Sequence, residues 1–169
     1  LRRRWRNSAA RQQLVELGAR TLLRVGTCGA LTASLSLGEL LIAGEALVAE
    51  GTSAALGAPE RVTATAELTG ALRAAAPGVR TVTVVSTDLF YDPTGREPDW
   101  RAAGASAVEM ESAVLFTLAG VHGIRAASVL IVSDLILPER HRIAAEALAA
   151  AEQEIGSLAV SALSLLRAG

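Results

Sequence analysis

The sequence predicts an α/β fold with a mostly parallel central sheet that helices cover. Apolar, β-branched runs of strand length alternate along the chain with Ala- and Leu-rich runs of helix length, the pattern of a sheet with helical crossovers. The 169 residues are 51% hydrophobic and 20% charged, enough apolar surface for one buried core. We expect one domain over residues 8–169 behind an Arg-rich tail at residues 1–7.

The first elements are a helix and a strand. Residues 8–17 predict a short helix, with Ser8 as its N-cap and Gly18 just after its last turn. The apolar run at residues 21–25 predicts a strand, and the glycines that follow predict a turn over residues 26–29.

The middle of the chain continues the alternation. A second strand is expected over residues 40–48, where Gly44 marks a bulge or a bend. Residues 65–76 are rich in Ala and Leu and stop at a Pro-Gly pair, which predicts a helix. Residues 81–85 are almost all β-branched and predict a buried strand.

The last third holds a loop, two strands and two helices. Residues 88–99 contain two prolines and a glycine, so a loop is expected there. A brief strand over residues 107–110 precedes a helix over 111–122. Residues 127–132 predict a third strong strand, and residues 143–166 a long helix.

Charge and cysteine content exclude several classes of function. All sixteen cations are Arg, against seventeen acids, so the net charge is −1; we expect neither a nucleic acid nor a membrane surface as partner. The absence of Lys excludes a Schiff-base lysine and the lysine of a phosphate-binding P-loop. The single Cys28 allows no disulfide and no multi-cysteine metal site, so a cytoplasmic location and no bound metal are expected.

Polar clusters follow three predicted strands, where the chemistry of a parallel sheet gathers. In the first, Arg24 can hold an anion with two hydrogen bonds, and Gly26 and Thr27 offer close backbone approach and a hydroxyl. In the second, Phe90 and Tyr91 stand out in a chain with 3% aromatic residues and can stack on a planar ring. A tight turn and a loop anchor are the structural alternatives.

Acidic residues form the remaining candidates. In extended backbone Glu109 and Glu111 point to one face around Met110, where carboxylates can accept hydrogen bonds from sugar hydroxyls. Asp134, beside Ser133 after a buried strand, is a candidate general acid. A helix start and a capping residue are the alternatives for these two groups.

Five segments, taken together, resemble the nucleoside phosphorylase family in its bacterial purine-nucleoside and uridine phosphorylase branch. They are RVGTCGA at residues 24–30, EGTS at 50–53, STDLFY at 86–91, VEMESA at 108–113 and VSD at 132–134. The resemblance implies the three-layer phosphorylase/hydrolase-like fold with a mixed central sheet. It also implies phosphorolysis of a purine nucleoside to free base and ribose 1-phosphate.

The resemblance assigns a role to each candidate residue. Phosphate would be held by Arg24, Gly26 and Thr27, and the nucleoside by Cys28, Gly29, Phe90, Glu109, Met110 and Glu111. Asp134 would protonate a purine ring nitrogen with Ser133 positioning it, and Arg140 or Arg142 would assist. The family needs no cofactor, uses inorganic phosphate as co-substrate, and usually forms hexamers, so a homo-oligomer is expected.

Alternatives remain within and outside this reaction. Uridine phosphorylases usually lack the Ser-Asp pair, and nucleosidases of the same fold lack the Arg of the first cluster, so Asp134 and Arg24 favour purine phosphorolysis. Family members carry roughly another third of chain upstream, so we expect an N-terminally truncated member with an unpaired sheet edge that must associate. A non-catalytic remnant that only binds nucleoside, or that assembles with partners, is the alternative of another class.

Overall fold

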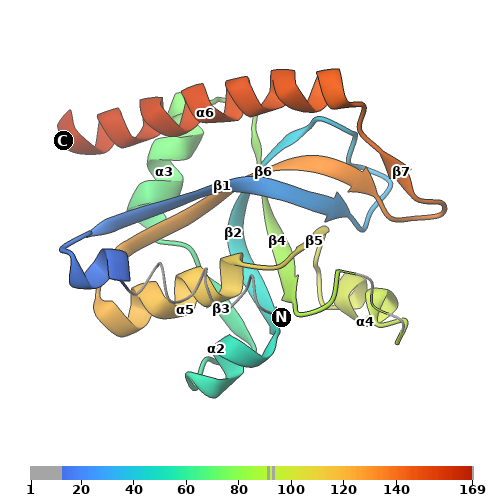
Figure 1. Cartoon of the computed structure of the whole chain (residues 1–169), viewed down its shortest axis with the longest axis horizontal. Helices are drawn as coiled ribbons and strands as arrows, with labels where there is room; N and C mark the ends of the chain where they lie inside the picture. Colours follow the sequence, from blue (N-terminus) through green and yellow to red (C-terminus); the bar gives the residue numbers. More distant parts are fainter. Residues whose placement is uncertain (1–12, 91, 93, 169) are drawn as a thin grey trace.

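The structure is a computed structural model that describes residues 13–90, 92 and 94–168. It contains a mixed sheet between two groups of helices (Figure 1), which confirms the predicted α/β class. The strands are β1 (Thr21–Ala30), β2 (Leu40–Ala49), β3 (Arg61–Thr63), β4 (Arg80–Thr87), β5 (Ala107–Glu109), β6 (Arg125–Leu135) and β7 (His141–Arg142). The helices are α2 (Gly51–Ala55), α3 (Ala66–Ala75), α4 (Glu97–Ala102), α5 (Ser112–His122) and α6 (Ala145–Ala168).

The sheet closes on itself. Its strand order is β3-β2-β4-β5-β1-β6-β7, and β2 also pairs with β6, so β2, β4, β5, β1 and β6 form a ring. The β1–β6, β2–β4 and β4–β5 pairs are parallel, and the β1–β5 and β2–β6 pairs are antiparallel. Ring closure brings the ends of strands that are distant in sequence to one side of the molecule.

Two register shifts bend the strands of this ring. Gly44 is the extra residue of β2 opposite β4, as its position in the sequence predicts. A Cβ on Gly44 would lie 2.6 Å from Cγ2 of Thr81, so glycine is what permits the close approach of β4. In β6 the shift leaves Ser133 without a partner in β1, because Val132 pairs with Cys28 and the next pair joins Asp134 to Gly29.

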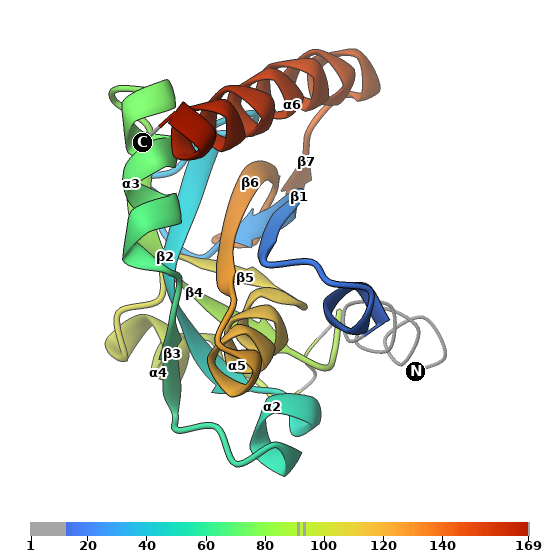
Figure 2. The same cartoon turned by 90° about the vertical axis from the view of Figure 1, so that its left-hand side faces the viewer.

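Helices α3 and α6 cover one face of the sheet (Figure 2). Buried α6 side chains recur at spacings of three and four residues, which places them on one stripe of the helix. That stripe consists of Ala151, Ile155, Leu158 and Ala162. It packs with Leu68 and Leu72 of α3 against the strands. None of the described helices is long and apolar enough to cross a bilayer.

Helix α5 packs on the other side of the ring and is buried over most of its length. It ends at Gly123, whose φ of 61° is the left-handed conformation that glycine adopts readily at a helix C-terminus. A smaller core lies near α4, where Trp100 packs with Leu31, Leu47 and Val85. Val108 of β5 and Ile136, which both line the site described below, pack against this smaller core.

The predicted strands and helices are confirmed at nearly all positions, with several differences. The turn expected over residues 26–29 is wrong, because β1 runs on to Ala30 while pairing with β6. The loop expected over residues 88–99 is wrong at its end, where α4 begins at Glu97. Of the predicted first helix, residues 13–16 are helical and Gly18 follows with φ of 96°. Ser8 and the tail lie outside the described residues.

Candidate active site

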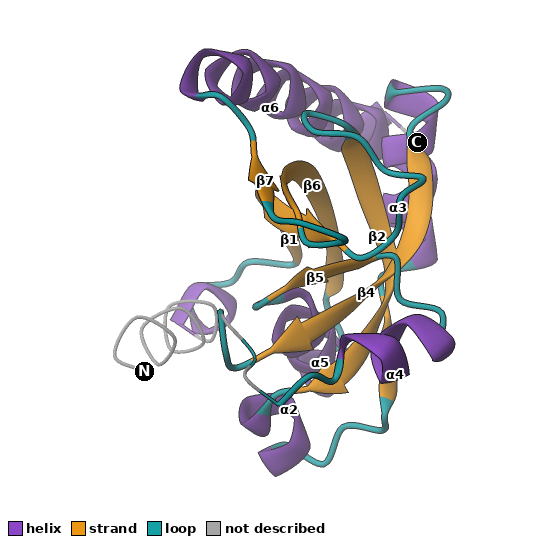
Figure 3. Cartoon of the chain, turned by 90° about the vertical axis from the view of Figure 1, so that its right-hand side faces the viewer, coloured by secondary structure: helices purple, strands orange, loops and turns teal. Residues whose placement is uncertain are grey.

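Strands β4, β5, β1 and β6 are consecutive neighbours in the sheet (Figure 3). A pocket of about 320 Å³ opens at residues of these four strands and of the segments that follow them. It is lined by Arg24, Gly26, Thr27, Cys28, Gly29, Thr87, Leu89, Phe90, Val108, Glu109, Met110, Glu111, Ser133, Asp134, Ile136 and Arg140. These residues come from segments far apart in sequence that the closed ring brings together. The pocket therefore contains every predicted site residue that the structure describes except Arg142.

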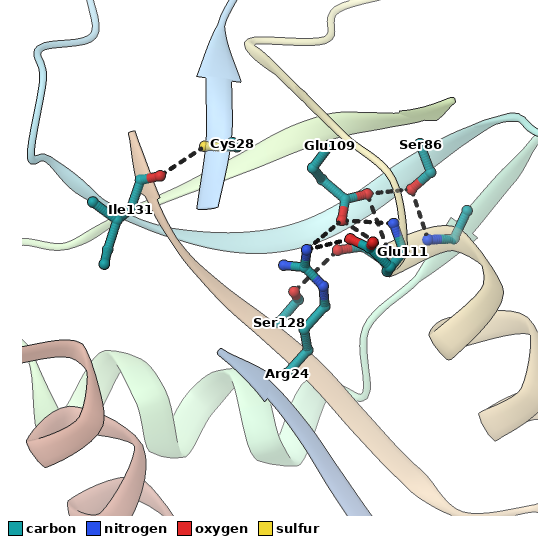
Figure 4. A network of polar contacts seen from close by, with 9 residues as sticks. Arg24, Cys28, Ser86, Glu109, Glu111, Ser128 and Ile131 are labelled. Atoms are coloured by element: carbon teal, nitrogen blue, oxygen red, sulfur yellow. Dashed lines mark hydrogen bonds and ion pairs between the residues drawn. The ribbon is translucent and has the colours of Figure 1, made fainter. Parts of the chain in front are cut away.

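Arg24 projects from the middle of β1, and its side chain is 13% exposed. Its Nη2 donates to Oε2 of Glu111 and lies 3.4 Å from Oε2 of Glu109 (Figure 4). Its Nη1 is buried and has no hydrogen-bond partner among the described residues. A buried cationic donor without a partner is costly to the fold, and an anion bound beside it would offset that cost.

Gly26 makes the position of Arg24 sterically possible. A Cβ on Gly26 would lie 2.4 Å from Nη1 and 2.7 Å from Cζ of Arg24. The guanidinium thus folds back over the backbone of its own strand, and a side chain at position 26 would force it out of this position. Gly26, which the sequence predicts to lie in a turn, instead leaves room in β1 for the Arg24 side chain.

Glu109, the last residue of β5, holds the start of α5. Its carboxylate accepts from the backbone N–H of Glu111 at 2.9 Å and from that of Ser112 at 3.0 Å. Ser86 Oγ donates to the same carboxylate and accepts from the N–H of Ala113 at 2.8 Å. The first N–H groups of the helix, which have no partner inside it, are satisfied in this way.

Glu111 and Met110 lie in the turn between β5 and α5. The Glu111 side chain is 21% exposed and pairs with Arg24 across the pocket. Both Glu109 and Glu111 therefore face Arg24, as the alternation of the segment predicts, although Glu111 already stands at the N-cap of α5.

The Ser133–Asp134 pair lies at the bulge of β6. Oδ2 of Asp134 accepts from Ser133 Oγ at 2.8 Å, and Oδ1 accepts from Nη2 of Arg140 at 2.8 Å. The Asp134 side chain is 7% exposed, and the guanidinium of Arg140 also lies 5.0 Å from the ring centroid of Phe90. The carboxylate is thus held from both sides, with an aromatic ring next to it.

A short hairpin explains how Arg140 reaches Asp134. Strand β7 turns back along β6 and pairs Asp134 with Arg142 and Leu135 with His141. Arg142 Nε lies 3.5 Å from Oδ1 of Asp134, but the Arg142 side chain is 70% exposed and lies outside the pocket lining. Of the two arginines that the sequence leaves open, Arg140 is the one in the pocket.

Cys28 and the rest of β1 complete one wall. The thiol donates to the carbonyl of Ile131 at 3.6 Å, and burial, followed by the nearby Glu109 carboxylate, raises the Cys28 pKa to about 12. A thiol with so high a pKa is a poor nucleophile and serves as a packing contact. Tyr91, the second aromatic residue of its segment, lies outside the described residues.

Several lining residues have no counterpart among the sequence predictions. Thr87, Leu89, Val108 and Ile136 line the pocket, and each lies within or beside a segment chosen for another residue. Their side chains carry no charge and mark no motif, so only the three-dimensional structure shows them. Ser86 was part of a predicted cluster, and its contacts show that it holds Glu109.

The fold agrees with comparisons to known proteins. The model of the family described as "Phosphorylase superfamily" matches residues 6–166. The chain belongs to this superfamily. A solved structure described as "Structural analysis of P knowlesi homolog of P falciparum PNP" superposes with a TM-score of 0.78 at 23% identity. The superposition covers 93% of this chain and 68% of that one, and it confirms the predicted fold.

Curated relatives carry more specific names. The chain is 36% identical over 124 residues to a guanosine phosphorylase of Halorubrum lacusprofundi, covering 70% of this chain and 52% of the relative. It is 36% identical over 137 residues to a DeoD-type purine nucleoside phosphorylase of Geobacillus kaustophilus, covering 76% and 57%. To a uridine phosphorylase of Escherichia coli it is 34% identical over 143 residues, covering 72% and 56%. The chain spans about half the length of these relatives.

Proposed function

We propose that this chain carries the principal part of a nucleoside phosphorylase site and that its substrates are a purine nucleoside and inorganic phosphate. The observation that carries the proposal is the composition of this pocket. The same cavity is lined by the buried Arg24, whose Nη1 has no partner among the described residues, by the partly exposed Glu111 carboxylate, and by the hydrogen-bonded pair Ser133 and Asp134. Each suits one part of the reaction.

Phosphate would bind at Arg24. Its Nη1 has no partner among the described residues, and Thr27 and the backbone near Gly26 line the same part of β1. A phosphate held there stabilises the positive charge that the sugar acquires as the glycosidic bond breaks. Attack by a phosphate oxygen on the anomeric carbon then gives ribose 1-phosphate.

The sugar and base would lie across the pocket from this anion. Glu111 would accept hydrogen bonds from the ribose hydroxyls beside Met110, and Phe90 would stack near the base with Cys28 and Gly29 against its edge. A departing purine leaves more readily when a ring nitrogen is protonated. Asp134 would supply that proton, with Ser133 and Arg140 orienting its two oxygens.

The base preference needs its own test, because relatives named for purines and for uridine both match the chain. We propose a purine because Asp134 would have a basic ring nitrogen to protonate only in that case. The test is base release from inosine, adenosine and uridine by this chain, with and without phosphate. Purine release that requires phosphate supports the proposal. Uridine cleavage would reassign the substrate, and release without phosphate would indicate hydrolysis.

The acid role of Asp134 is tested with an N7-methylated purine nucleoside. Its ring already carries the positive charge that protonation would supply, so it needs no acid. Asp134→Asn should lower turnover of inosine about 100-fold and spare the methylated substrate. Equal losses on both substrates would remove Asp134 from this role.

We further propose that the reaction takes place in the cytoplasm in a homo-oligomer without a cofactor. Large apolar side chains such as Leu17 (85% exposed), Val121 (60%) and Phe90 (57%) are uncovered on the single chain, which supports association. Analytical ultracentrifugation of this chain tests the oligomer. A single monomeric species across the accessible concentration range would contradict it.

A further inference from the structure

Glu109 lines the pocket, yet its carboxylate is fully committed within the protein. Its side chain is 1% exposed. Oε1 accepts from Ser86 Oγ and the N–H of Ser112, and Oε2 accepts from the N–H groups of Glu111 and Ser112. Since these donors occupy the lone pairs of both oxygens, the carboxylate has little capacity left for the hydroxyls of a ligand.

Ser86 extends this arrangement away from the pocket. It is completely buried at the end of β4 and is not a lining residue. Its hydroxyl donates to Glu109 and accepts from the N–H of Ala113, so it ties β4 to β5 and to the start of α5 (Figure 4). The Glu109 carboxylate is therefore fixed by two segments besides its own strand, β4 and the start of α5.

Arg24 has two carboxylate neighbours that differ in exposure. Both are near its Nη2, but Glu111 is 21% exposed with its side chain reaching into the pocket, whereas Glu109 is buried and fixed. If Glu111 turns toward a sugar, as the proposed function requires, Arg24 loses one partner. Only Glu109 then remains as a countercharge to hold a guanidinium that is otherwise largely buried.

We propose that Glu109, held by Ser86, is a positioning residue that keeps Arg24 in place for the phosphate while Glu111 serves the sugar. This inference rests on the proposed function and assigns different duties to two acids that the sequence places side by side. Glu109 acts through Arg24 and the start of α5 and contacts neither substrate. In this proposal Glu111 leaves Arg24 when it binds the sugar, whereas Glu109 stays beside Arg24 throughout.

The test compares Glu109→Gln with a matched control, Glu50→Gln. Glu50 is also buried and also caps a helix, α2, but it is not a pocket residue. Isothermal titration calorimetry on the full chain measures the affinity for inorganic phosphate and, separately, the affinity for inosine. Glu109→Gln should weaken phosphate binding about tenfold and inosine binding much less, and Glu50→Gln should change neither. Equal losses in the two variants, or a loss confined to inosine, would overturn the inference.

Ser86→Ala keeps the inference testable if Glu109→Gln fails to fold. Because Ser86 does not line the pocket, a fall in phosphate affinity of about threefold in this variant must be transmitted through its two partners, the Glu109 carboxylate and the start of α5 that this carboxylate holds. Unchanged phosphate affinity in a folded Ser86→Ala chain would contradict the proposal that the hydrogen bond from Ser86 to Glu109 helps to position Arg24.

A ligand-free measurement separates this inference from the proposed function. In a chain with isotope-labelled arginine, the Nε–H signal of Arg24 reports by NMR how firmly its guanidinium is held. Glu109→Gln should accelerate its hydrogen exchange about tenfold, and Glu50→Gln should not. If the unmodified chain binds no phosphate, the proposed function fails, and this signal still decides whether Glu109 positions Arg24. An unchanged Arg24 signal in Glu109→Gln overturns the inference alone.

Discussion

At two places in this molecule a buried glutamate accepts backbone N–H groups at the start of a helix, and only one of the two glutamates lines the pocket. Glu50 follows β2 and accepts from the N–H groups of Thr52 at 2.7 Å and Ser53 at 2.8 Å at the start of α2. Glu109 ends β5 and accepts the corresponding N–H groups of α5. Both residues are 4% exposed.

The surroundings of the two carboxylates differ. Glu109 has Arg24 beside it and the Ser86 hydroxyl behind it, whereas no cation pairs with Glu50 among the residues that the structure describes. At Glu50 the helix N–H groups alone offset the burial of the charge. The comparison teaches that both buried acids hold the start of a helix after a strand, and that only the acid beside an arginine of another strand also lines the pocket.

The largest difference should appear in stability. Glu50→Ala removes a cap and should cost about 1 kcal/mol of unfolding free energy. Glu109→Ala removes a cap and also leaves the largely buried Arg24 with a single acid, so we expect a loss of about 3 kcal/mol. Urea unfolding of the two variants measures both values. Equal losses would mean that the ion pair with Arg24 adds nothing to the cap.

A double-mutant cycle isolates the arginine itself. The unfolding free energies of Arg24→Met, Glu109→Gln and their combination should reveal a coupling of about 2 kcal/mol. The same cycle with Glu50→Gln should be additive within about 0.5 kcal/mol, since Glu50 has no contact with Arg24. An equally large coupling energy between Arg24 and Glu50 would contradict this expectation, because it would mean that removing any buried carboxylate changes stability in the same way.

Two glycines extend the comparison to the backbone. An alanine Cβ at Gly26 would meet the Arg24 guanidinium at 2.4 Å, whereas the nearest atom to a Cβ at Gly51 is Oδ2 of Asp88 at 3.6 Å. Gly26→Ala should therefore weaken phosphate binding about tenfold, or about 1.4 kcal/mol. Gly51→Ala should leave binding unchanged, and a parallel loss in both would contradict the steric argument. Calorimetry with inorganic phosphate provides the measurement.

The smallest effect is expected at Cys28, whose pKa responds to Glu109. Burial is the larger cause of the rise from 9.0 to about 12, and the Glu109 charge adds to it. Since folding favours the protonated thiol, its contribution to stability is complete below pH 9 and is lost as the pH rises toward 12. Glu109→Gln should lower this pKa and Glu50→Gln should not, as thiolate absorbance in the ultraviolet will show. A Cys28 pKa that falls equally in both variants would contradict a specific effect of Glu109.

Much of the fold could be predicted from the sequence because its signals are local. The β-branched run of β4 and the Pro-Gly stop after α3 each determine an element without reference to the rest of the chain. The short elements β3 and β7 could not be found in this way, since three and two residues form strands only because β2 and β6 lie beside them. The antiparallel pairing of β2 with β6, which closes the ring, has no local signal either.

The site shows the same division. The charged residues and glycines that line the pocket could be predicted because charged and glycine-rich clusters follow apolar strands, whereas Thr87, Leu89, Val108 and Ile136 could not. The contacts between these residues could not be predicted. Arg140 reaches Asp134 only because β7 turns back along β6, and the position of the Arg24 side chain depends on the absence of a side chain at Gly26. The sequence therefore predicts which residues lie together, and the structure adds which hydrogen bonds and ion pairs join them.

The closed ring of strands also has a consequence for how the chain folds. Arg24 and Glu111 are 87 residues apart in sequence, and their pairing depends on β1, β5 and β6 all being in register. Pairings between distant segments form late because long loops must close first, so the chain should fold slowly compared with a helical protein of its length. The pocket is then among the last parts of the molecule to form. Recovery of phosphate binding during refolding would mark the final closure of the ring.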